Sequence, residues 1–450
     1  MKAAVIGSGP NGLVAAIVLA QAGLDVEVFE AQPELGGGVR TAELTLPGFR
    51  HDVCSAIHPF ARAAFPFERI GVSVEWIESP AACVHPFADG TALTLERGID
   101  ATAAQLGRDG AAYRRLVGPV ARGLGQFGRG RFPFASLPRA LDAVRSARAL
   151  AGSRFVEERT RAFFAGHAAH SVLPLERRPS AGFGLVLLAS GHVVGWPFPR
   201  GGAQAISDAL VARLRELGGV AHTSSRADEL PRADVVVADV MPRELLRLAR
   251  FPRRYESALR RYRHASAAFK LDWALDGPIP WATEKCRRAA TVHLGGTFEQ
   301  IAESERDHRS RRPFVLLAQH TLFDPSRAPE GKHTAWAYCH VPNGWREDRT
   351  DAIEAQIERF APGFRKLVLA RSVRGPAELE SDNGNYVGGD ISGGAMDLRQ
   401  LLFRPARRLV PYRTPRRGVY LCSAATPPGG GVHGLSGYAA ARFALRDLRR

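Results

Sequence analysis

A glycine-rich turn close to the start of the sequence constrains the fold of this 450-residue chain more than any other feature. Residues 3–6 form a short apolar run that predicts a strand, and residues 13–22 predict a helix. A Gly-x-Gly-x-x-Gly turn at residues 7–12 joins the two, and a second β-rich run at 26–29 ends at Glu30. Strand, glycine turn, helix, strand and acid is the order of a dinucleotide-binding unit, so we predict an α/β fold of the Rossmann type with a parallel sheet.

Each residue type in this turn has a physical role in holding a dinucleotide. Gly7 permits the tight turn, Gly9 lets the backbone approach a pyrophosphate, and Gly12 lets the helix pack closely against the strand. The free amides at the start of the helix face the phosphates. Glu30 is placed to accept hydrogen bonds from the ribose hydroxyls of an adenosine, which disfavours a 2′-phosphate. The predicted cofactor-binding residues of this unit are Gly7, Gly9, Pro10, Asn11, Gly12 and Glu30.

The loop that follows Glu30 favours a flavin over a nicotinamide. Residues 34–41 contain three consecutive glycines and an arginine, whereas a nicotinamide dehydrogenase would begin another helix here. This loop resembles the one in flavin adenine dinucleotide (FAD) proteins, in which the backbone and the arginine contact the diphosphate and the ribityl chain. The resemblance implies that the cofactor is also bound by Gly37, Gly38, Arg40 and Thr41.

Later segments of the chain return to this cofactor domain. Residues 205–217 predict a helix, and the valine-rich run 233–238 predicts a short buried strand. A further strand is predicted at 419–422, followed by a closing helix at 434–449. The FAD-binding domain is therefore expected to be discontinuous and to comprise residues 1–75, 195–250 and 410–450.

The segments between these pieces predict a second, discontinuous α+β domain that binds the substrate. Runs of β-forming residues at 267–275, 314–317 and 334–341 are separated by polar and Pro/Gly-rich turns. Residues 105–190 are expected to be mainly helical. The predicted substrate domain comprises residues 76–194 and 251–409.

Two late motifs, residues 385–394 and 422–434, are the most specific in the chain. Together with the N-terminal glycine motifs they resemble the phytoene desaturase-related flavoproteins of the flavin amine oxidase/phytoene desaturase superfamily. The resemblance spans almost the full chain and is closest to the branch of pyridine nucleotide-disulfide oxidoreductase domain-containing protein 2. It implies that the flavin pyrimidine is contacted by Gly430, Gly431 and Val432, with the amides of the following helix stabilising negative charge on the reduced ring.

The chain departs from these relatives in two places. A β-meander that usually precedes the return strand looks deleted, because only residues 223–232 intervene. The adenine contact expected there falls on Arg226 or Ala227 by position. Ser423 stands where the wider class often has an acid that binds the ribityl chain or a phosphate, and we keep Ser423 as the cofactor-binding candidate at this point.

Residues beside these motifs are candidates for the chemistry and for contact with the substrate. His433 could act in proton transfer, or it could bond the backbone and hold the flavin loop. Asp390 could orient the substrate, or it could bond a neighbouring helix terminus. His58, Trp196 and Tyr386 are the candidates for lining the substrate cavity, with simple packing as the alternative role for such residues.

The spacing of cysteine and histidine residues argues against several other classes of protein. The five cysteines lie far apart and include no Cys-x-x-Cys, so neither a disulfide framework, a zinc ribbon nor a redox-active pair is indicated. No P-loop, Ser-His-Asp order or metal-ligand spacing stands out. Hydrolysis, phosphoryl transfer and metal catalysis therefore have no support, and no metal ligand is predicted.

Arginine gives the chain a net charge of +16 and gathers in two basic segments. The second segment, residues 404–417, has six arginines and no acid. Both segments suit either a peripheral contact with an anionic membrane or a solvated basic face. The scattered cysteines favour a reducing cytoplasm, and because no apolar run could span a bilayer we expect a soluble or peripheral protein. We expect no nucleic-acid partner. The first segment leads into a predicted amphipathic helix at 137–150 and carries Arg129, Arg131, Arg139, Arg145 and Arg148.

The resemblance implies an enzyme that holds FAD noncovalently and acts on a carbon–carbon bond. Desaturation, saturation or isomerisation of an apolar, carotenoid- or lipid-like substrate would pass hydride to flavin N5, and oxygen, a quinone or another acceptor would reoxidise the flavin. The sequence has no second dinucleotide motif, which argues against a separate NADPH domain. Two alternatives remain: an amine-oxidase-like flavoenzyme acting on C–N bonds, and a non-catalytic protein that keeps FAD for stability and binds a partner.

Overall fold

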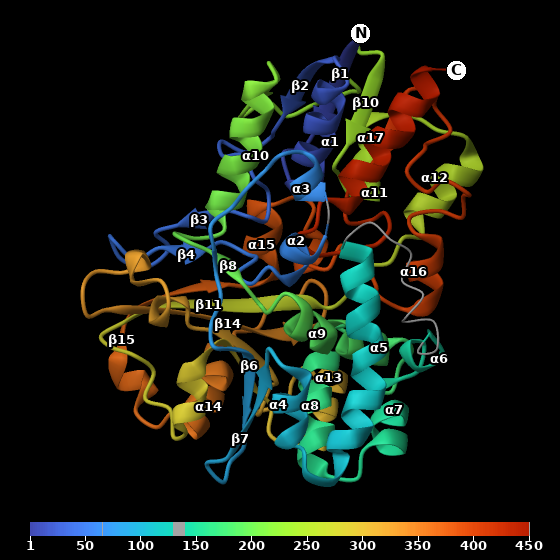
Figure 1. The fold of residues 1–450 in the computed structure, drawn as a ribbon. Helices are drawn as coiled ribbons and strands as arrows, with labels where there is room; N and C mark the ends of the chain where they lie inside the picture. The colour runs from blue at the N-terminus through green and yellow to red at the C-terminus, as the bar shows by residue number, and fades with distance from the viewer. Residues whose placement is uncertain (65, 129–139, 450) are drawn as a thin grey trace.

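The computed structural model describes residues 1–64, 66–128 and 140–449. Two large β-sheets and a layer of helices make up most of the described chain (Figure 1). One sheet is parallel and lies beside both ends of the chain, and the other is mixed and lies farther from them. The candidate site lies between the two sheets.

The parallel sheet has five strands in the order β16-β10-β1-β2-β9, and all of its pairings are parallel. Helices cover both of its faces, as the burial of a parallel sheet requires. The predicted Rossmann-type α/β fold is therefore confirmed. The strands are β1 (Lys2–Ile6), β2 (Asp25–Phe29), β9 (Val220–His222), β10 (Val235–Ala238) and β16 (Val419–Leu421).

Alternate residues of these strands pack on different helices. Ala3 and Val5 pack on one helical layer, whereas Ala4 and Ile6 pack on the other. Within the first layer, α1 and α17 approach so closely that a Cβ atom on Gly437 would overlap the backbone near Asn11. The first layer contains α1 (Pro10–Gln21), α10 (Gln204–Glu216) and α17 (Leu435–Leu448), and the second contains α11 (Pro242–Leu248) and α12 (Arg253–Arg260).

The connection between β9 and β10 is a loop without further strands. Residues 223–234 contain only turns, bends and irregular backbone. No strand forms between β9 and β10, as the short spacing predicts, and the deletion relative to the relatives stays a prediction. As a consequence, the backbone passes directly from β9 to β10 past the edge of the candidate site.

The mixed sheet has seven strands in the order β15-β11-β14-β13-β12-β6-β7. Its pairings are antiparallel except that β12 and β6 run parallel. The predicted runs correspond to β11, β13 and β14, whereas the other four strands were not predicted. The bounds are β6 (Ala81–Pro86), β7 (Ala92–Glu96), β11 (Ala267–Leu275), β12 (Ala289–Leu294), β13 (Val315–Ala318), β14 (His333–Val341) and β15 (Val368–Arg374).

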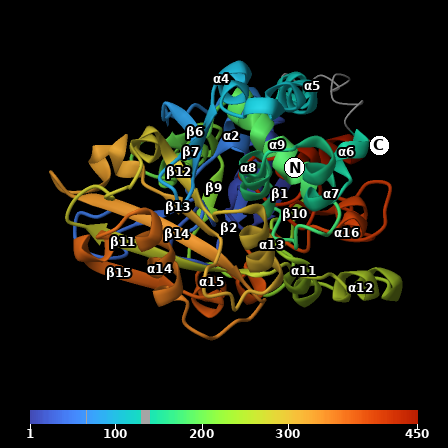
Figure 2. The same cartoon turned by 90° about the horizontal axis from the view of Figure 1, so that it is seen from below.

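A layer of helices packs on the β6–β12 side of the mixed sheet (Figures 1 and 2). Its core joins buried aromatic residues such as Phe163 and Phe164 to Leu95 and Leu316 of the sheet. Most described residues between 105 and 190 are helical. The helices are α4 (Ile99–Ala104), α5 (Gly110–Gly128), α6 (Ala140–Ala143), α7 (Ala147–Arg154), α8 (Glu158–Ala169), α9 (Ser180–Val193) and α13 (Phe298–Arg306).

The single helix predicted for residues 137–150 is wrong within the described part of the chain. Residues 137–139 lie outside the described residues, and the rest forms the two short helices α6 and α7. Ser146 ends the continuity because its backbone is extended and its side chain accepts a hydrogen bond from the backbone N–H of Ala149. Leu141 is 81% exposed, so it does not pack on the rest of the protein.

The remaining elements are short strands and surface helices. No helix among the described residues has the length and apolar character needed to cross a membrane. Two small sheets pair β3 (Thr41–Ala42) with β4 (His51–Asp52), and β5 (Trp76–Ile77) with β8 (Phe198–Pro199). The other helices are α2 (Pro59–Ala63), α3 (Pro66–Arg69), α14 (Thr350–Phe360), α15 (Pro376–Asp382) and α16 (Leu398–Phe403).

Candidate active site

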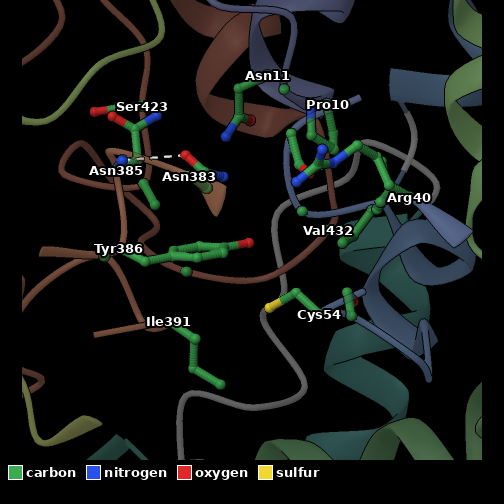
Figure 3. A pocket seen from close by; sticks show the side chains of 18 of the residues that line it. Pro10, Asn11, Arg40, Cys54, Asn383, Asn385, Tyr386, Ile391, Ser423 and Val432 are labelled. Carbon is green, nitrogen blue, oxygen red and sulfur yellow. Dashed lines mark hydrogen bonds between the residues drawn. The ribbon is translucent and has the colours of Figure 1, made fainter. Parts of the chain in front are cut away.

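A cavity of about 570 Å³ extends from the carboxyl ends of the parallel strands to the mixed sheet (Figure 3). Open α/β sheets bind ligands at this edge, and the volume is typical of a site for a small organic molecule. Most of the predicted site residues lie in its wall. They are Gly7, Gly9, Pro10, Asn11, Glu30, Gly37, Gly38, Arg40, His58, Trp196, Tyr386, Ser423, Gly430, Gly431 and Val432.

Gly12 and Thr41 lie outside the cavity wall. A Cβ atom on Gly12 would overlap the backbone oxygen of Gly7, so this glycine permits the close packing of helix and strand. The Thr41 hydroxyl donates to Asp52 Oδ1 at 2.9 Å and accepts from the backbone N–H of Gln204 at 3.0 Å. Thr41 therefore ties the second glycine loop to the start of α10.

His433 also lies outside the cavity wall, directly behind the loop that carries Gly430 and Gly431. Its Nε2 lies 3.1 Å from the backbone oxygen of Gly429, and its Nδ1 accepts from the backbone N–H of Leu435 at 3.1 Å. Burial lowers the pKa of His433 to about 4, so the ring is neutral at pH 7. This geometry gives His433 the loop-holding role, and proton transfer by this residue stays a prediction.

Asp390 has a similar position behind the cavity. Its carboxylate is fully buried and accepts three backbone N–H bonds, from Ala265 at 2.9 Å, Ser392 at 2.8 Å and Gly394 at 2.7 Å. These bonds hold the turn that follows Asp390 against the backbone of Ala265, which lies just before β11. Orientation of a substrate by Asp390 stays a prediction.

The Glu30 carboxylate connects the two glycine loops. Its Oε2 accepts from both the backbone N–H and the hydroxyl of Ser8, at 2.9 and 2.6 Å, and its Oε1 accepts from the backbone N–H of Gln32 at 2.9 Å. The Ser8 hydroxyl in turn accepts from the backbone N–H of Gly36 at 3.1 Å. Glu30 therefore lies in the cavity wall directly after β2, and through Ser8 it joins the first glycine loop to the second.

Asp239 is an acid in the cavity wall that the sequence analysis did not select. It follows the end of β10, and its Oδ2 accepts from the backbone N–H of Gly12 at 2.9 Å. Burial raises the pKa of Asp239 to about 7, and the nearby charge of Glu30 adds to the rise. Its position one residue beyond a predicted strand was the available signal, because the carboxyl ends of parallel strands meet at the ligand edge.

Arg40 holds the second glycine loop in place. Its Nε donates to the backbone oxygen of Gly37 at 2.9 Å, and its Nη2 donates to the backbone oxygen of Asp382 at 3.2 Å. The side chain is almost fully buried and still forms part of the cavity wall. Arg40 therefore joins the loop to the end of α15, a contact between segments more than three hundred residues apart.

The half of the cavity nearest the mixed sheet is apolar and aromatic. Leu316 and Leu317 of β13 and Trp336 and Tyr338 of β14 form this part of the wall. The two aromatic rings meet edge to face with their centroids 5.1 Å apart. His58 lies on the same side, and burial lowers its pKa to about 4, which leaves it neutral at pH 7.

Tyr386 and Cys54 lie at the boundary between the two halves. In Figure 3 the Tyr386 ring lies between Asn383 and Ile391, with its hydroxyl directed into the cavity. A Cβ atom on Gly38 would overlap that hydroxyl, so glycine is required where the loop passes the ring. Burial raises the pKa of the Cys54 thiol, which keeps it neutral. Sequence motifs gave no signal for Cys54, which reaches the cavity only through the fold.

The residues present fit a dinucleotide cofactor at the glycine-rich end. The Asn11 side-chain oxygen is buried in the wall and has no hydrogen-bond partner, so it has capacity for a ligand donor. A Cβ atom on Gly37 would lie only 3.0 Å from the Cα atom of Gly9, so the two loops meet with bare backbone. Arg226 and Ala227 from the shortened β9–β10 loop also line this end.

Several arginines of the two basic segments are paired with acids or buried, rather than free to contact a membrane as predicted. Arg129, Arg131 and Arg139 lie outside the described residues, and Arg148 binds Glu176 and Glu299 at 3.0 and 2.6 Å. Arg145 lies 3.6 Å from Asp142. In the second segment, the prediction that Arg404 contacts lipid headgroups is wrong. Arg404 is 1% exposed, and its Nη2 lies 3.4 Å from the backbone oxygen of Gly393.

Comparisons with known proteins agree with this geometry. Residues 5–66 match the NAD(P)-binding Rossmann-like domain family. Pyridine nucleotide-disulfide oxidoreductase domain-containing protein 2 of Mus musculus is 26% identical over 99% of this chain and 94% of its own length. A phytoene dehydrogenase of Streptomyces griseus is 27% identical over 95% of this chain and 91% of its own length.

A solved structure supports the same fold. The crystal structure of an oxidoreductase from Methanosarcina mazei matches with a TM-score of 0.68 at 18% identity, over the full length of both chains. The glycine turn, the loop after β2 and the parallel sheet thus occur together with similarity to these two relatives over almost the full chain. The chain is similar to proteins of the FAD-dependent oxidoreductase superfamily that includes the phytoene desaturases.

Proposed function

We propose that this protein is an oxidoreductase that holds FAD noncovalently and acts on a carbon–carbon bond of an apolar, carotenoid- or lipid-like substrate. One observation carries the proposal: a single cavity joins a glycine-rich end suited to a dinucleotide with an apolar, aromatic end. The residues of the glycine-rich end would hold the nucleotide of a flavin, and the apolar end would take the substrate. Desaturation, saturation and isomerisation are the reactions that fit.

The glycine-rich end supplies the parts that hold the cofactor. Glu30 would accept hydrogen bonds from the ribose hydroxyls, and the backbone near Gly9 and Asn11 would hold the diphosphate. Gly430 and Gly431, on the loop that His433 holds, would contact the flavin ring. The protein is expected to be yellow and to release its FAD on denaturation. A preparation that stays colourless after addition of FAD, or a flavin that remains attached after denaturation, contradicts this proposal.

When bound, the flavin supplies a hydride acceptor, and the protein supplies shape and dryness around it. Leu316, Trp336 and Tyr338 exclude water from the substrate side, and neutral His58 adds no charge there. Among the described wall residues, the acidic side chains come from the segments around the parallel sheet and α15, away from β13 and β14. They are Glu30, Glu34, Asp239, Glu244, Glu380 and Asp382.

This distribution of charge separates the leading function from an amine oxidase. An ammonium substrate needs a carboxylate or an aromatic face near its nitrogen. The edge-to-face pair Trp336 and Tyr338 offers such a face, so an amine substrate is the second candidate. The absence of an acidic side chain from the described residues of β13 and β14 in the wall favours an uncharged substrate.

An anaerobic flavin-reduction screen tests these functions against each other. The purified holoprotein is mixed with polyenes, unsaturated lipids or primary amines, and the flavin absorbance is followed in the absence of oxygen. Bleaching by a polyene or lipid supports the proposal, and bleaching by amines alone supports the second candidate. If no compound in a broad panel reduces the oxidised flavin, reoxidises the dithionite-reduced flavin or is isomerised by the holoprotein, the non-catalytic, partner-binding alternative is favoured. Oxygen and a quinone then serve as the candidate acceptors for reoxidation.

The proposal includes peripheral contact with an anionic membrane, which would deliver an apolar substrate. Leu402 and Phe403 of α16 and the following Leu409 are exposed apolar side chains, with Leu409 wholly exposed. Arg407 lies against the Phe403 ring, with its guanidinium carbon 5.2 Å from the centroid, and Arg408 belongs to the same segment. Apolar side chains beside arginines suit the boundary of headgroups and acyl chains.

A further inference from the structure

One cysteine thiol and three histidine imidazoles, all buried, lie between the mixed sheet and helix α8. Cys83 and His85 lie on β6, His293 lies on β12, and His167 lies on α8. All four residues have 0% exposure. They come from three distant parts of the sequence, so no local spacing announces them.

The strand register explains why the sheet residues share a face. Cys83 pairs with Thr291 in the parallel β6–β12 ladder. Side chains alternate along a strand, so Cys83 and His85 lie on one face of β6, and Thr291 and His293 lie on the same side of β12. Helix α8 covers this face and adds His167 from above.

Each histidine ring is fixed by a bond at its outer nitrogen. His85 Nε2 lies 2.9 Å from the backbone oxygen of Gly296, and His167 Nδ1 lies 2.8 Å from the backbone oxygen of Phe163. His293 Nε2 lies 3.0 Å from Nε2 of His170. A carbonyl oxygen only accepts, so the outer nitrogens of His85 and His167 carry the protons. Metal-binding histidines are characteristically oriented by such bonds at the nitrogen remote from the metal.

The inner nitrogens of the three rings have no hydrogen-bond partner. They are His85 Nδ1, His167 Nε2 and His293 Nδ1. Because the outer nitrogens of His85 and His167 carry the protons, their inner nitrogens present bare lone pairs. Buried acceptors without a donor need a compensating partner.

The ligand atoms converge on one small space. One ligand atom from each of Cys83, His167 and His293 lies within 4.8 Å of the others. Gly166 leaves this space free, because a Cβ atom there would lie 2.9 Å from His293 Nδ1 and 3.1 Å from His85 Nδ1. A thiol and several imidazoles, with no carboxylate in the group, form a donor set suited to zinc rather than to magnesium or calcium.

We propose that Cys83, His167 and His293 bind a zinc ion, with His85 as the fourth ligand. On binding, the Cys83 thiol loses its proton to solvent and its sulfur bonds to the ion, while the neutral imidazoles donate lone pairs, so one proton is released per ion. The site has no place for a substrate, because its ligands are fully buried among Phe163, Trp196 and Phe314. The ion therefore braces α8 against β6 and β12.

The location connects this brace to the substrate end of the cavity. Trp196 and Thr291 line the cavity, and the Trp196 ring centroid lies 5.5 Å from that of His167 and 5.7 Å from that of His293. His170, which also lines the cavity, bonds His293. Zinc would therefore fix the positions of Trp196, Thr291 and His170 in the wall of the apolar end. The glycine loops at the dinucleotide end contribute no ligand.

The test measures metal in the intact, FAD-loaded protein produced in zinc-supplemented medium. Zinc per chain is determined by mass spectrometry after dialysis against a weak chelator, and the coordination shell is determined by X-ray absorption. The variants are Cys83→Ser and His293→Gln. Cys339→Ser is the matched control, because Cys339 is equally buried in the same sheet but lies outside the group.

We expect about one zinc per chain in the wild type and the control, with a shell of one sulfur at about 2.3 Å and nitrogens at about 2.0 Å. Zinc retention should fall at least about tenfold in both ligand variants, while the FAD absorbance is unchanged. Wild-type protein without zinc, zinc retained equally by Cys83→Ser and the control, another metal in its place, or a shell without sulfur would each overturn the proposal. If the variants do not fold, the wild-type metal content and absorption spectrum still decide it, and neither measurement depends on turnover.

Discussion

The parallel sheet and the mixed sheet line the same cavity by different physical means. On the parallel side the wall is largely backbone, with Gly9, Gly37 and Gly431 bringing bare main chain to the surface. On the mixed side the wall consists of large side chains such as Trp336 and Tyr338. Backbone amides bind phosphate whatever the neighbouring side chains are, whereas apolar side chains select a shape. Substitutions on the two sides should therefore separate cofactor binding from substrate binding.

The largest expected effect is at Gly9. A Cβ atom at this position would lie 2.6 Å from Asp239 Oδ2, so the larger side chain of Gly9→Val must displace a buried carboxylate or the loop itself. We expect FAD affinity to fall by about 100-fold or more, or ~3 kcal/mol, measured by equilibrium dialysis. Gly152→Ala in α7 is the control, since nothing lies within 4 Å of its Cβ position. Equal FAD affinity in both variants would separate this loop from the cofactor.

Glu30→Gln is expected to have the next largest effect. The change removes the charged acceptor for ribose and weakens the bonds from Ser8, so FAD affinity should fall about tenfold or more, in line with ~1.5–3 kcal/mol for a bond to a charged group. Glu27→Gln tests the same chemistry on the exposed face of β2 and should leave affinity unchanged. Unchanged affinity in Glu30→Gln would show that the ribose contact is made elsewhere.

Asp239 makes the parallel side sensitive to pH. Its folded-state pKa, about 7, lies above the unfolded value, so the stability it contributes is full at low pH and is lost as the pH rises toward 7. Relative to Asp239→Asn, FAD-free wild-type protein should therefore lose on the order of 2 kcal/mol of unfolding free energy between about pH 4 and pH 7. Urea denaturation at several pH values measures this difference. A constant difference across that range would contradict the raised pKa.

Trp336→Leu tests the mixed side. Loss of the large ring from the apolar end should raise KM for the substrate that bleaches the flavin by about tenfold, the effect of a changed hydrophobic pocket. FAD content should stay the same, which is the reverse of the result expected at Glu30. Trp345→Leu is the control, because Trp345 lies outside the cavity wall. Loss of FAD in Trp336→Leu, but not in the control, would refute the assignment of cofactor binding to the parallel side and substrate binding to the mixed side.

The last prediction concerns contact with a membrane. Arg407→Gln combined with Arg408→Gln should weaken binding to anionic vesicles by ~1 kcal/mol per arginine at low salt. Raised ionic strength should release the wild-type protein, and neutral vesicles should bind little of it. Arg287→Gln, which removes an exposed arginine elsewhere on the surface, should leave vesicle binding unchanged. If the wild-type protein does not bind anionic vesicles at low salt, the membrane contact is refuted, and the net charge of +16 is explained by solvated surface arginines.

Local patterns were enough to predict β1, β2, β10 and β16 of the parallel sheet. The strand, turn, helix and strand of residues 2–29 form within one short segment, and each glycine position is specified by a close backbone approach. The closing helix after Gly434 is preceded by an equally local glycine-rich loop. Where a backbone conformation requires glycine, the glycine itself marks that position in the sequence.

The mixed sheet and its surroundings could not be predicted in the same way. β6 contains His85 and Pro86, which weaken a strand pattern, and β15 alternates partly buried with exposed residues at an edge of the sheet. Cys54, Asp239 and the histidine group reach their neighbours through pairings across long stretches of chain. Such contacts depend on strand order and register, which local periodicity does not encode.

The arrangement of the parallel sheet has a consequence for synthesis of the protein. β16 pairs with β10 at one edge, and α17 packs on α1, the first helix of the chain. Until residues 419–448 have left the ribosome, the N-terminal glycine turn lacks its neighbour and α1 has an uncovered apolar face. The nucleotide-binding half therefore stays incomplete until residues 419–448 have been synthesised. We expect flavin capture to follow their synthesis, and aggregation through the uncovered face of α1 to be the main risk before it.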